Sequence, residues 1–254
     1  SEGGSDWNKI IIMNALTKEI IDETIVDVKF SGTSWLGDEG FYYSSYDKPK
    51  GSELSAKTDT HKVYFHKLGT KQSADKLIIG GEDFKRRYMG IGVSDDERYE
   101  ILSASEATNG NELYIKDLTN KTDFIPVQKG YEFNTDFIDS KGDVIYALTD
   151  KNAPNMRLVK FNINNPHVWT DVIPETENVL SVSTGGGYIF ARYMKDAVTS
   201  MKQFDYDGKL IRTIELPGIG TASGFGGKEK EKDLYFSFTN YITPGTIYKF
   251  NTEK

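Results

Sequence analysis

Residues 89–127 read MGIGVSDDERYEILSASEATNGNELYIKDLTNKTDFIPV, and this stretch decides the fold. Four short runs of apolar, aromatic and β-branched residues alternate with polar turns, which predicts four strands. The Asn109-Gly110 pair suits the positive φ of a tight hairpin turn, and Pro126 is tolerated on an outer edge strand. The predicted strands cover 89–94, 99–104, 112–118 and 124–127.

The same four-strand unit returns along the chain. Its third strand is the easiest to recognise, because an apolar and aromatic run is often followed there by Asn or Asp. Steps of 53, 50, 45, 43 and 46 residues separate the anchors of these runs. The anchors are Ile10, Val63, Leu113, Leu158, Met201 and Ile247. A period in the forties, filled with strands, is typical of propeller blades.

The repeat divides the chain into blades. We expect an all-β fold, a β-propeller of four-stranded antiparallel blades. The expected parts are a blade fragment at 1–30, full repeats at about 31–82, 83–130, 131–175 and 176–217, and an incomplete blade at 218–254. Cutting a ring within a blade leaves unpaired sheet edges, which natural proteins avoid. A piece of a larger propeller is therefore expected, with a small ring closed by its own ends as the alternative.

Composition excludes several classes. The chain has 254 residues, with 38 acidic and 31 basic side chains and a formal net charge of −7. Nucleic acid is not an expected partner, because the phosphate backbone requires a basic surface. No apolar run approaches the roughly 20 residues that cross a bilayer, so no membrane span is expected. Cysteine is absent, which excludes disulfides, thiolate metal sites and a Cys nucleophile.

Catalytic motifs are weak. No Gly-x-Ser-x-Gly nucleophile elbow is present, and residues 221–227 around Ser223 lack the first glycine and a following helix. We interpret these glycines as allowing close backbone approach in an innermost strand. His61, His66 and His167 are expected to be ordinary surface or loop histidines. The first two would face opposite sides of a strand, and neither has a carboxylate at ligand spacing. No metal or cofactor is expected.

Turn chemistry explains most other polar clusters. The acidic pairs Asp38-Glu39 and Asp95-Asp96 and the glycine run at 185–187 all fall between the first and second strands of a repeat. No Lys and helix follow the glycines, so they form no phosphate loop. Lys85-Arg86-Arg87 is interpreted as a solvated loop, with a peptide-carboxylate or interdomain contact as the alternative. The longest irregular segment, 47–60, is of a length that is typically functional or disordered.

An ordered set of segments resembles the propeller of the prolyl oligopeptidase family. Single motifs such as Ser-Asp-Asp-x-Arg-Tyr occur in many propellers, whereas the ordered set is specific. The match runs over essentially the whole chain and looks most similar to flavobacterial members. The segments are 27–35 (DVKFSGTSW), 38–43 (DEGFYY), 61–70 (HKVYFHKLGT), 88–90 (YMG), 94–99 (SDDERY) and 236–248 (FSFTNYITPGTIY).

The resemblance implies a seven-bladed propeller, of which this chain carries about five blades' worth, beside an α/β-hydrolase domain of the same protein. The serine-peptidase triad lies in that catalytic domain, so this chain alone is expected to be no enzyme. The propeller is expected to admit short proline-containing peptides, which the enzyme cleaves after proline, and to exclude folded proteins. Flavobacterial relatives are typically exported, so the resemblance favours the periplasm, with the cytoplasm as the alternative.

The resemblance also implies site residues. Phe30 and Met89 match an apolar wall of the substrate pocket, with ordinary core packing as the alternative for both. Thr108 takes a third wall position, where the family often has Cys. The segment 47–60 matches a mobile family loop that is thought to gate access. Its candidate residues are Asp47, Lys48, Lys50, Lys57 and Thr60.

Two other classes of function are open to a propeller. A standalone scaffold of the WD-repeat kind would end its third strands in Trp-Asp. The runs here end without Trp, in Asn14, Asp117, Asn162 and Asp205. A propeller glycosidase needs several buried carboxylates that converge on the axis, whereas the acids of this chain fall mostly in turns.

Overall fold

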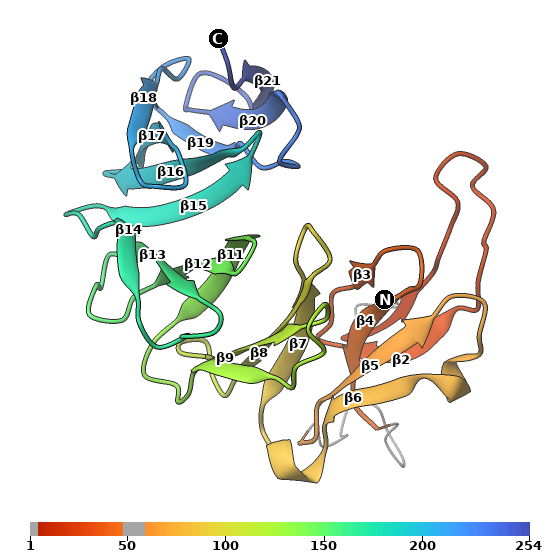
Figure 1. Ribbon diagram of the computed structural model, residues 1–254. Helices are drawn as coiled ribbons and strands as arrows, with labels where there is room; N and C mark the ends of the chain where they lie inside the picture. Colours follow the sequence, from red (N-terminus) through yellow and green to blue (C-terminus); the bar gives the residue numbers. More distant parts are fainter. Residues whose placement is uncertain (1–4, 48–58) are drawn as a thin grey trace. The chain divides into compact units, whose positions relative to one another are not determined.

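The computed structural model describes residues 5–47 and 59–254, which are almost entirely β-structure (Figure 1). The chain divides into two compact units, residues 1–132 and 133–254. Within the described residues the strands form antiparallel sheets, three of them four-stranded with the strands in sequence order or its reverse. The predicted all-β fold with four-stranded antiparallel blades is therefore confirmed.

The first sheet of the first unit is the largest. Its strand order is β1-β2-β4-β5-β6, and β3 pairs with β4. All six residues of β4 are buried, as expected for a central strand. The strands are β1 (Trp7–Ile10), β2 (Ile25–Lys29), β3 (Ser34–Leu36), β4 (Gly40–Ser45), β5 (Lys62–Lys67) and β6 (Lys76–Gly80).

Residues 1–30 differ from the expected separate blade fragment. β1 and β2 form an antiparallel pair in which Trp7 lies opposite Lys29. β2 then joins β4, with Val28 opposite Ser45, so both strands belong to the first sheet. The run anchored at Ile10 was predicted to form the third strand of a repeat, whereas β1 ends at Ile10 itself, and β2 was not predicted as a strand. A local repeat cannot reveal such pairings, because the partner strands lie 15 or more residues away.

The second sheet of this unit has the order β10-β9-β8-β7. Gly110, between β8 and β9, has a φ of +80°, and a Cβ there would lie 1.8 Å from the Tyr131 carbonyl oxygen. The predicted positive φ is thus confirmed at Gly110, where glycine is required for two separate reasons, although residues 106–111 form a longer connection than a tight hairpin turn. Pro126 lies on the edge strand β10, as predicted. The strands are β7 (Tyr88–Val93), β8 (Tyr99–Ser105), β9 (Glu112–Asp117) and β10 (Ile125–Gln128).

The second unit contains three sheets, and the two-residue period of a strand is visible in the burial of some of their strands. In β20 the alternation of exposed and buried residues is complete from end to end. The third sheet has β11 (Thr135–Lys141), β12 (Val144–Thr149), β13 (Arg157–Asn162) and β14 (Thr170–Ile173). The fourth has β15 (Val179–Gly185), β16 (Tyr188–Lys195), β17 (Val198–Phe204) and β18 (Leu210–Ile214). The fifth has β19 (Thr221–Gly224), β20 (Asp233–Thr239) and β21 (Thr246–Asn251).

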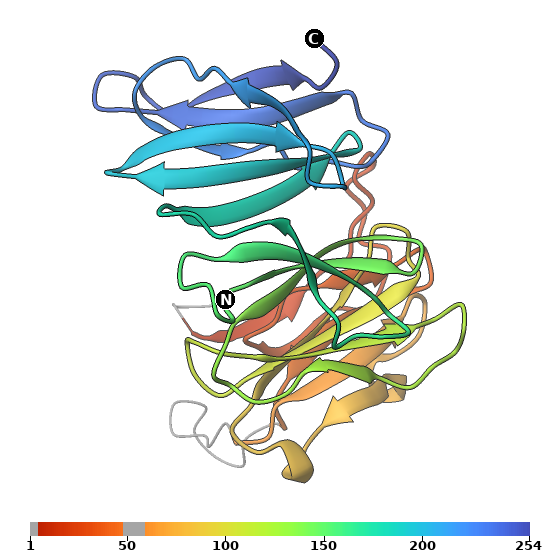
Figure 2. The ribbon, with the colours of Figure 1, turned by 60° about the vertical axis from the view of Figure 1, so that its left-hand side comes forward.

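Neighbouring sheets within each unit bury their apolar faces against each other. Figure 2 shows the fourth and fifth sheets, in cyan and blue, lying face to face. Phe190 and Met201 of the fourth sheet pack there with Phe236 and Phe238 of the fifth. Leu158 and Leu180 belong to a similar core between the third and fourth sheets. Each large apolar side chain buried in this way contributes about 1.5–3 kcal/mol to folding.

Helical structure is limited to two single 3-10 turns among the described residues, η2 (Gln72–Ala74) and η3 (Glu82–Phe84). Neither has the length or the apolar character that a helix needs to cross a membrane.

Candidate functional site

Phe30, the first predicted wall residue, follows β2 directly and presents its ring to solvent. The side chain is 48% exposed, and the backbone has a φ of +51°. A positive φ costs a bulky L-residue roughly 1–2 kcal/mol. The contacts of the ring therefore have to offset this cost.

Three neighbouring rings support Phe30, and we call the four residues Phe30, Tyr46, His61 and Tyr88 the Phe30 aromatic cluster. The centroid of the Phe30 ring lies 6.3 Å from that of Tyr46 and 5.7 Å from that of Tyr88, both edge-on. His61 lies 4.6 Å from Tyr46 and 6.2 Å from Tyr88. Such ring pairs contribute about 0.5–1.5 kcal/mol each beyond the burial of area. The cluster thus holds the exposed faces of Phe30 and Tyr88 on a buried base of Tyr46 and His61.

The hydrogen bonds of His61 define its tautomer. The Met89 N–H donates to Nδ1 at 2.9 Å, so Nδ1 is unprotonated. Nε2 then carries the proton and donates to the Lys29 carbonyl oxygen at 3.3 Å. Burial lowers the pKa of His61, whose side chain is 1% exposed. A neutral imidazole therefore joins the end of β2 to the start of β7.

Met89, the second predicted wall residue, has its side chain in the core. It is 3% exposed and packs with Tyr42, Val63 and Leu102. Its carbonyl oxygen accepts a hydrogen bond from the Ser44 hydroxyl at 2.8 Å. Met89 thus contacts the Phe30 aromatic cluster only through the hydrogen bond of its N–H group to His61. Its side chain packs in the core, as the alternative interpretation expected. Its role as a pocket wall remains a prediction.

The other predicted site residues lie elsewhere in the first unit. Thr108 is exposed in the bend between β8 and β9, and no ring contact or hydrogen bond among the described residues joins it to the Phe30 aromatic cluster. Asp47 and Thr60 are the first and last residues of the predicted gating segment, and the Asp47 carboxylate pairs with Lys62 Nζ at 2.5 Å. Lys48, Lys50 and Lys57 lie outside the described residues.

The expectation of surface or loop histidines is wrong for His61 and His66. His66 is 0% exposed, and its Nδ1 lies 2.7 Å from an Asp75 carboxylate oxygen. Its Nε2 lies 3.3 Å from the Asp22 carboxylate. Asp22 stands 44 residues away in sequence, so local spacing could not reveal it. His167 is exposed in a turn, as expected.

The Asp22–His66–Asp75 group is a closed structural network. Tyr43 donates its hydroxyl proton to the second Asp75 oxygen at 2.8 Å, and the Gly69 N–H donates to Asp22 at 2.8 Å. Burial raises the pKa of the Asp22 carboxyl, but hydrogen bonds from the Gly69 and Glu23 N–H groups, together with His66, outweigh it, and the pKa is lowered overall. Among the described residues no group of three or more His, Cys, Asp or Glu is arranged to hold a metal.

The remaining motifs behave as turn and strand residues. Asp96 accepts hydrogen bonds from the Ser94 hydroxyl and the Arg98 N–H within its turn. Ser223 Oγ lies 3.0 Å from Ser237 Oγ and has no histidine partner. A Cβ on Gly224 would lie 2.7 Å from the Tyr235 carbonyl oxygen, which confirms close backbone approach as the reason for glycine.

The basic trio is more ordered than a solvated loop. Lys85 pairs with Glu82 at 2.6 Å, as a surface pair does. The guanidinium of Arg87 lies over the rings of Phe84 and Tyr131, 5.7 Å and 5.6 Å from their centroids. Cation–π contacts hold this side chain where the sequence indicated free exposure.

The chemistry available at the Phe30 aromatic cluster is recognition. It offers exposed aromatic edges and apolar surface, which suit an apolar side chain. It offers no nucleophile beside a base, because both ring nitrogens of His61 are occupied by backbone groups. Tyr46, Tyr88 and His61 were not predicted as site residues. Their only signal in the sequence is adjacency to Asp47, Met89 and the segment 61–70.

Antiparallel sheets, three of them four-stranded, that pack face to face within each unit define the class: this is a chain built of β-propeller blades. It belongs to the family described as the prolyl oligopeptidase N-terminal β-propeller domain, which matches residues 1–254. The resemblance drawn from the sequence is thereby confirmed. The match also favours a propeller of this family over a standalone scaffold.

Individual relatives agree with this assignment. The chain is 66% identical over 254 residues to a prolyl endopeptidase of Elizabethkingia meningoseptica, and 65% identical over 256 residues to one of Elizabethkingia miricola. These alignments cover 99% and 100% of this chain but 36% of each relative. The chain thus spans little more than a third of the length of the curated relatives it matches.

Solved structures show the same fold. A chain from a study of two prolyl endopeptidases has a TM-score of 0.90 at 30% identity, covering 99% of this chain and 37% of that one. Prolyl oligopeptidase B from Galerina marginata, bound to a 35mer substrate, has a TM-score of 0.87 at 20% identity. That alignment covers 99% of this chain and 37% of the other, and at this identity it shows the fold alone.

Proposed function

We propose that this chain is the non-catalytic propeller of a serine peptidase that cleaves short peptides after proline. The observation that carries the proposal is the family match over all 254 residues, joined to 66% identity with a prolyl endopeptidase. An α/β-hydrolase domain of the same protein would supply the nucleophile. None of the three histidines, all of which the structure describes, bonds to a serine.

Within that enzyme we assign the propeller two roles. It restricts access to short peptides, with the segment around Asp47 to Thr60 as the gate. It also contributes to the substrate-pocket wall through Phe30, Met89 and Thr108. The exposed ring of Phe30 supports the second role, because a strained backbone and a ring open to solvent are unusual for a residue that only packs.

The first experiment compares two purified proteins, the protein as its gene encodes it and the 254-residue chain. Both are assayed with a fluorogenic Gly-Pro peptide and with a serine-reactive fluorophosphonate label. We expect turnover and labelling of the gene-encoded protein, and neither with the 254-residue chain. Turnover with label on the 254-residue chain would overturn the non-catalytic assignment and return attention to Ser223. No turnover by the gene-encoded protein would overturn the prolyl peptidase assignment.

A second experiment tests the pocket wall in the gene-encoded protein. Phe30→Ala is expected to raise KM for the fluorogenic peptide about three- to tenfold with kcat little changed, because it removes apolar contact made in both ground and transition states. Tyr235→Ala is the matched control, since Tyr235 is a similarly exposed aromatic on β20 that lines no proposed site. Equal effects of the two variants would remove Phe30 from the site.

The compartment belongs to the same proposal. We place the protein in the periplasm, on the basis of its similarity to flavobacterial members of the family. Fractionation of the native cells, with prolyl peptidase activity followed in each fraction, tests this placement. Activity that stays with the cytoplasmic fraction would favour the alternative compartment.

A further inference from the structure

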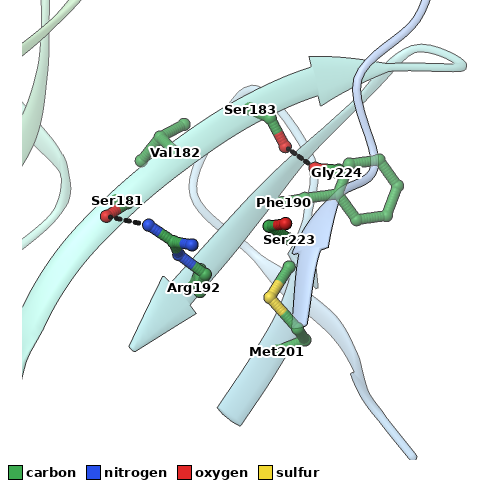
Figure 3. A pocket seen from close by; sticks show the side chains of 8 residues that line it. All are labelled: Ser181, Val182, Ser183, Phe190, Arg192, Met201, Ser223 and Gly224. Carbon is green, nitrogen blue, oxygen red and sulfur yellow. Dashed lines mark hydrogen bonds between the residues drawn. The ribbon is translucent and has the colours of Figure 1, made fainter. Parts of the chain in front are cut away.

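The second unit contains a cavity of about 210 Å³ beside the first strands of the fourth and fifth sheets (Figure 3). β15, β16 and β17 supply most of its lining, and β19 supplies the rest. Hydroxyl groups, apolar side chains and one guanidinium face it. The lining residues are Ser181, Val182, Ser183, Phe190, Arg192, Met201, Ser223 and Gly224.

Strand register explains why a charge lies here. Ser181, Arg192 and Met201 form one row across β15, β16 and β17. Arg192 therefore lies two residues from Phe190 on the same face of β16. That face packs against the fifth sheet, where Phe190 and Met201 are core residues. A guanidinium occupies a position at which the pattern of the strand calls for an apolar side chain.

Arg192 lacks the counter-charge that comparable arginines have. Among the described residues its one hydrogen-bond partner is the Ser181 hydroxyl, at 3.2 Å (Figure 3). Arg98 and Arg157, which are also half-buried, each lie 2.7 Å from an aspartate oxygen. Arg212 donates to Gln203 and to backbone carbonyl groups. A partly desolvated cation without a counter-ion is costly, so its retention here needs a reason.

We propose that this cavity binds the carboxylate of a short peptide, with Arg192 as the recognising cation. Guanidinium N–H groups form a planar fork that matches a carboxylate, and only Ser181 engages that fork in the protein. Ser223 Oγ lies 3.0 Å from Ser237 Oγ, and when Ser237 donates within this pair, the Ser223 hydroxyl offers a further donor to the ligand. Phe190 and Met201 lower the local dielectric constant, which strengthens the pair, and they suit the aliphatic part of a peptide. A single cation matches a monoanion better than a phosphate dianion.

The choice of a peptide as the carrier rests on the proposed function, whereas the choice of a carboxylate rests on the cavity alone. The carboxylate could belong to a peptide C-terminus or to a small free acid. Both present the same group to Arg192. A peptide would also contact the apolar lining of the cavity, whereas a small acid would not.

Calorimetry on the gene-encoded protein tests the assignment. The probes are N-acetyl-glycyl-alanine with a free carboxylate, the same peptide as its C-terminal amide, and sodium acetate. We expect the acid to bind at least tenfold more tightly than the amide and than acetate. Equal affinities of acid and amide would overturn the carboxylate site. Acetate binding as tightly as the peptide acid would overturn the peptide assignment.

Substitutions localise the effect. Arg192→Gln is expected to abolish the preference for the acid over the amide. Arg157→Gln is the matched control, because Arg157 is half-buried but already paired with Asp171, and it should keep the preference. A preference that survives in Arg192→Gln would place the binding site elsewhere and overturn the assignment.

A second pair of variants guards against misfolding of Arg192→Gln. Ser181→Asp places a carboxylate directly opposite Arg192 on the neighbouring strand, so it should occupy the guanidinium from within and abolish acid binding while the protein stays folded. Ser181→Asn is the neutral, nearly isosteric control and should retain acid binding. Acid binding unchanged in Ser181→Asp would overturn the assignment.

The proline-cleavage assay separates this inference from the proposed function. If the wild-type protein does not cleave the proline substrate, the proposed function is wrong, but the calorimetric evidence for carboxylate binding is unaffected. Arg192→Gln is expected to leave turnover of an amidated proline substrate within about twofold of wild type, since that substrate carries no carboxylate for the site.

Discussion

His61 and His66 lie five residues apart, both fully buried, in opposite surroundings. One ring nitrogen of His61 faces a backbone donor and the other faces a backbone acceptor. Both ring nitrogens of His66 face carboxylates, those of Asp75 and Asp22. Burial without a charged partner lowers the pKa of His61. The comparison teaches that the long-range partners of a buried histidine, and not its depth, decide what its ring nitrogens meet: backbone groups at His61 and carboxylates at His66.

The largest expected effect comes from His66→Leu. This variant removes the hydrogen bonds of His66 to both Asp75 and Asp22, and a hydrogen bond to a charged group contributes about 1.5–3 kcal/mol, so losing both costs about 3–6 kcal/mol. Urea denaturation should show a free energy of unfolding lower by that amount. His167→Leu, at an exposed turn, is the control and should change stability by less than about 0.5 kcal/mol. A loss below about 1 kcal/mol in His66→Leu would show that the network adds little to stability.

His61→Leu should destabilise less, by about 1–3 kcal/mol, because it orphans the Met89 N–H and the Lys29 carbonyl but no charge. The same variant should weaken peptide binding in the cleavage assay, since the rings of Tyr46 and Tyr88 that support Phe30 both contact His61. A KM equal to that of the wild type would show that His61 does not affect peptide binding through Phe30.

The pH dependence of stability should also distinguish the two histidines. Because the folded-state pKa of His61 lies below its ordinary value, the unfolded chain binds a proton more readily as the pH falls. The contribution of neutral His61 is therefore complete above about pH 6.5 and is lost as the pH falls through the folded-state pKa, at a slope of up to about 1.4 kcal/mol per pH unit. The difference in unfolding free energy between wild type and His61→Leu should shrink over that range. A constant difference from pH 8 to 5 would contradict this linkage.

Asp22 adds a second, more acidic step on the His66 side. Its lowered pKa means that its contribution is present above the unfolded-state pKa of about 3.9 and is lost as the pH falls through the folded-state value. Asp22→Asn should remove the part of the acid transition that lies below about pH 4 and leave the part near pH 6 intact. Denaturation curves collected at half-unit pH intervals would resolve the two steps.

The smallest effect is expected at Phe30, the residue through which the Phe30 aromatic cluster reaches the surface. Phe30→Gly should be more stable than Phe30→Ala by about 1 kcal/mol, because glycine adopts a φ of +51° without the steric cost of a Cβ. Both variants lose the same ring, so their difference in thermal unfolding isolates the backbone. Equal stability would mean that the turn relaxes when the ring is removed.

Much of the fold could be predicted, because strands and turns depend mainly on residues that are close together in sequence. Residues 112–118 predicted β9 to within a residue, and the positive φ of Gly110 was predicted with its physical reason. β1 and β2 were not predicted to join the first sheet, because their pairing with β4 depends on contacts distant in sequence. The candidate site was predictable only through the family resemblance. No local pattern marks Phe30 as exposed, or Tyr46 and His61 as its support.

The sequence by itself determined the all-β class, the repeat in the forties, the turns and the membership in the prolyl oligopeptidase propeller family, because a two-residue alternation and turn chemistry act over a few neighbouring residues. The tertiary structure alone decided which side chains meet. It brought Asp22 to His66 across 44 residues, placed His61 between β2 and β7, and left Arg192 on a core-facing row with a single hydroxyl partner. Such contacts depend on sheet register and on packing between sheets, and local sequence carries no record of either.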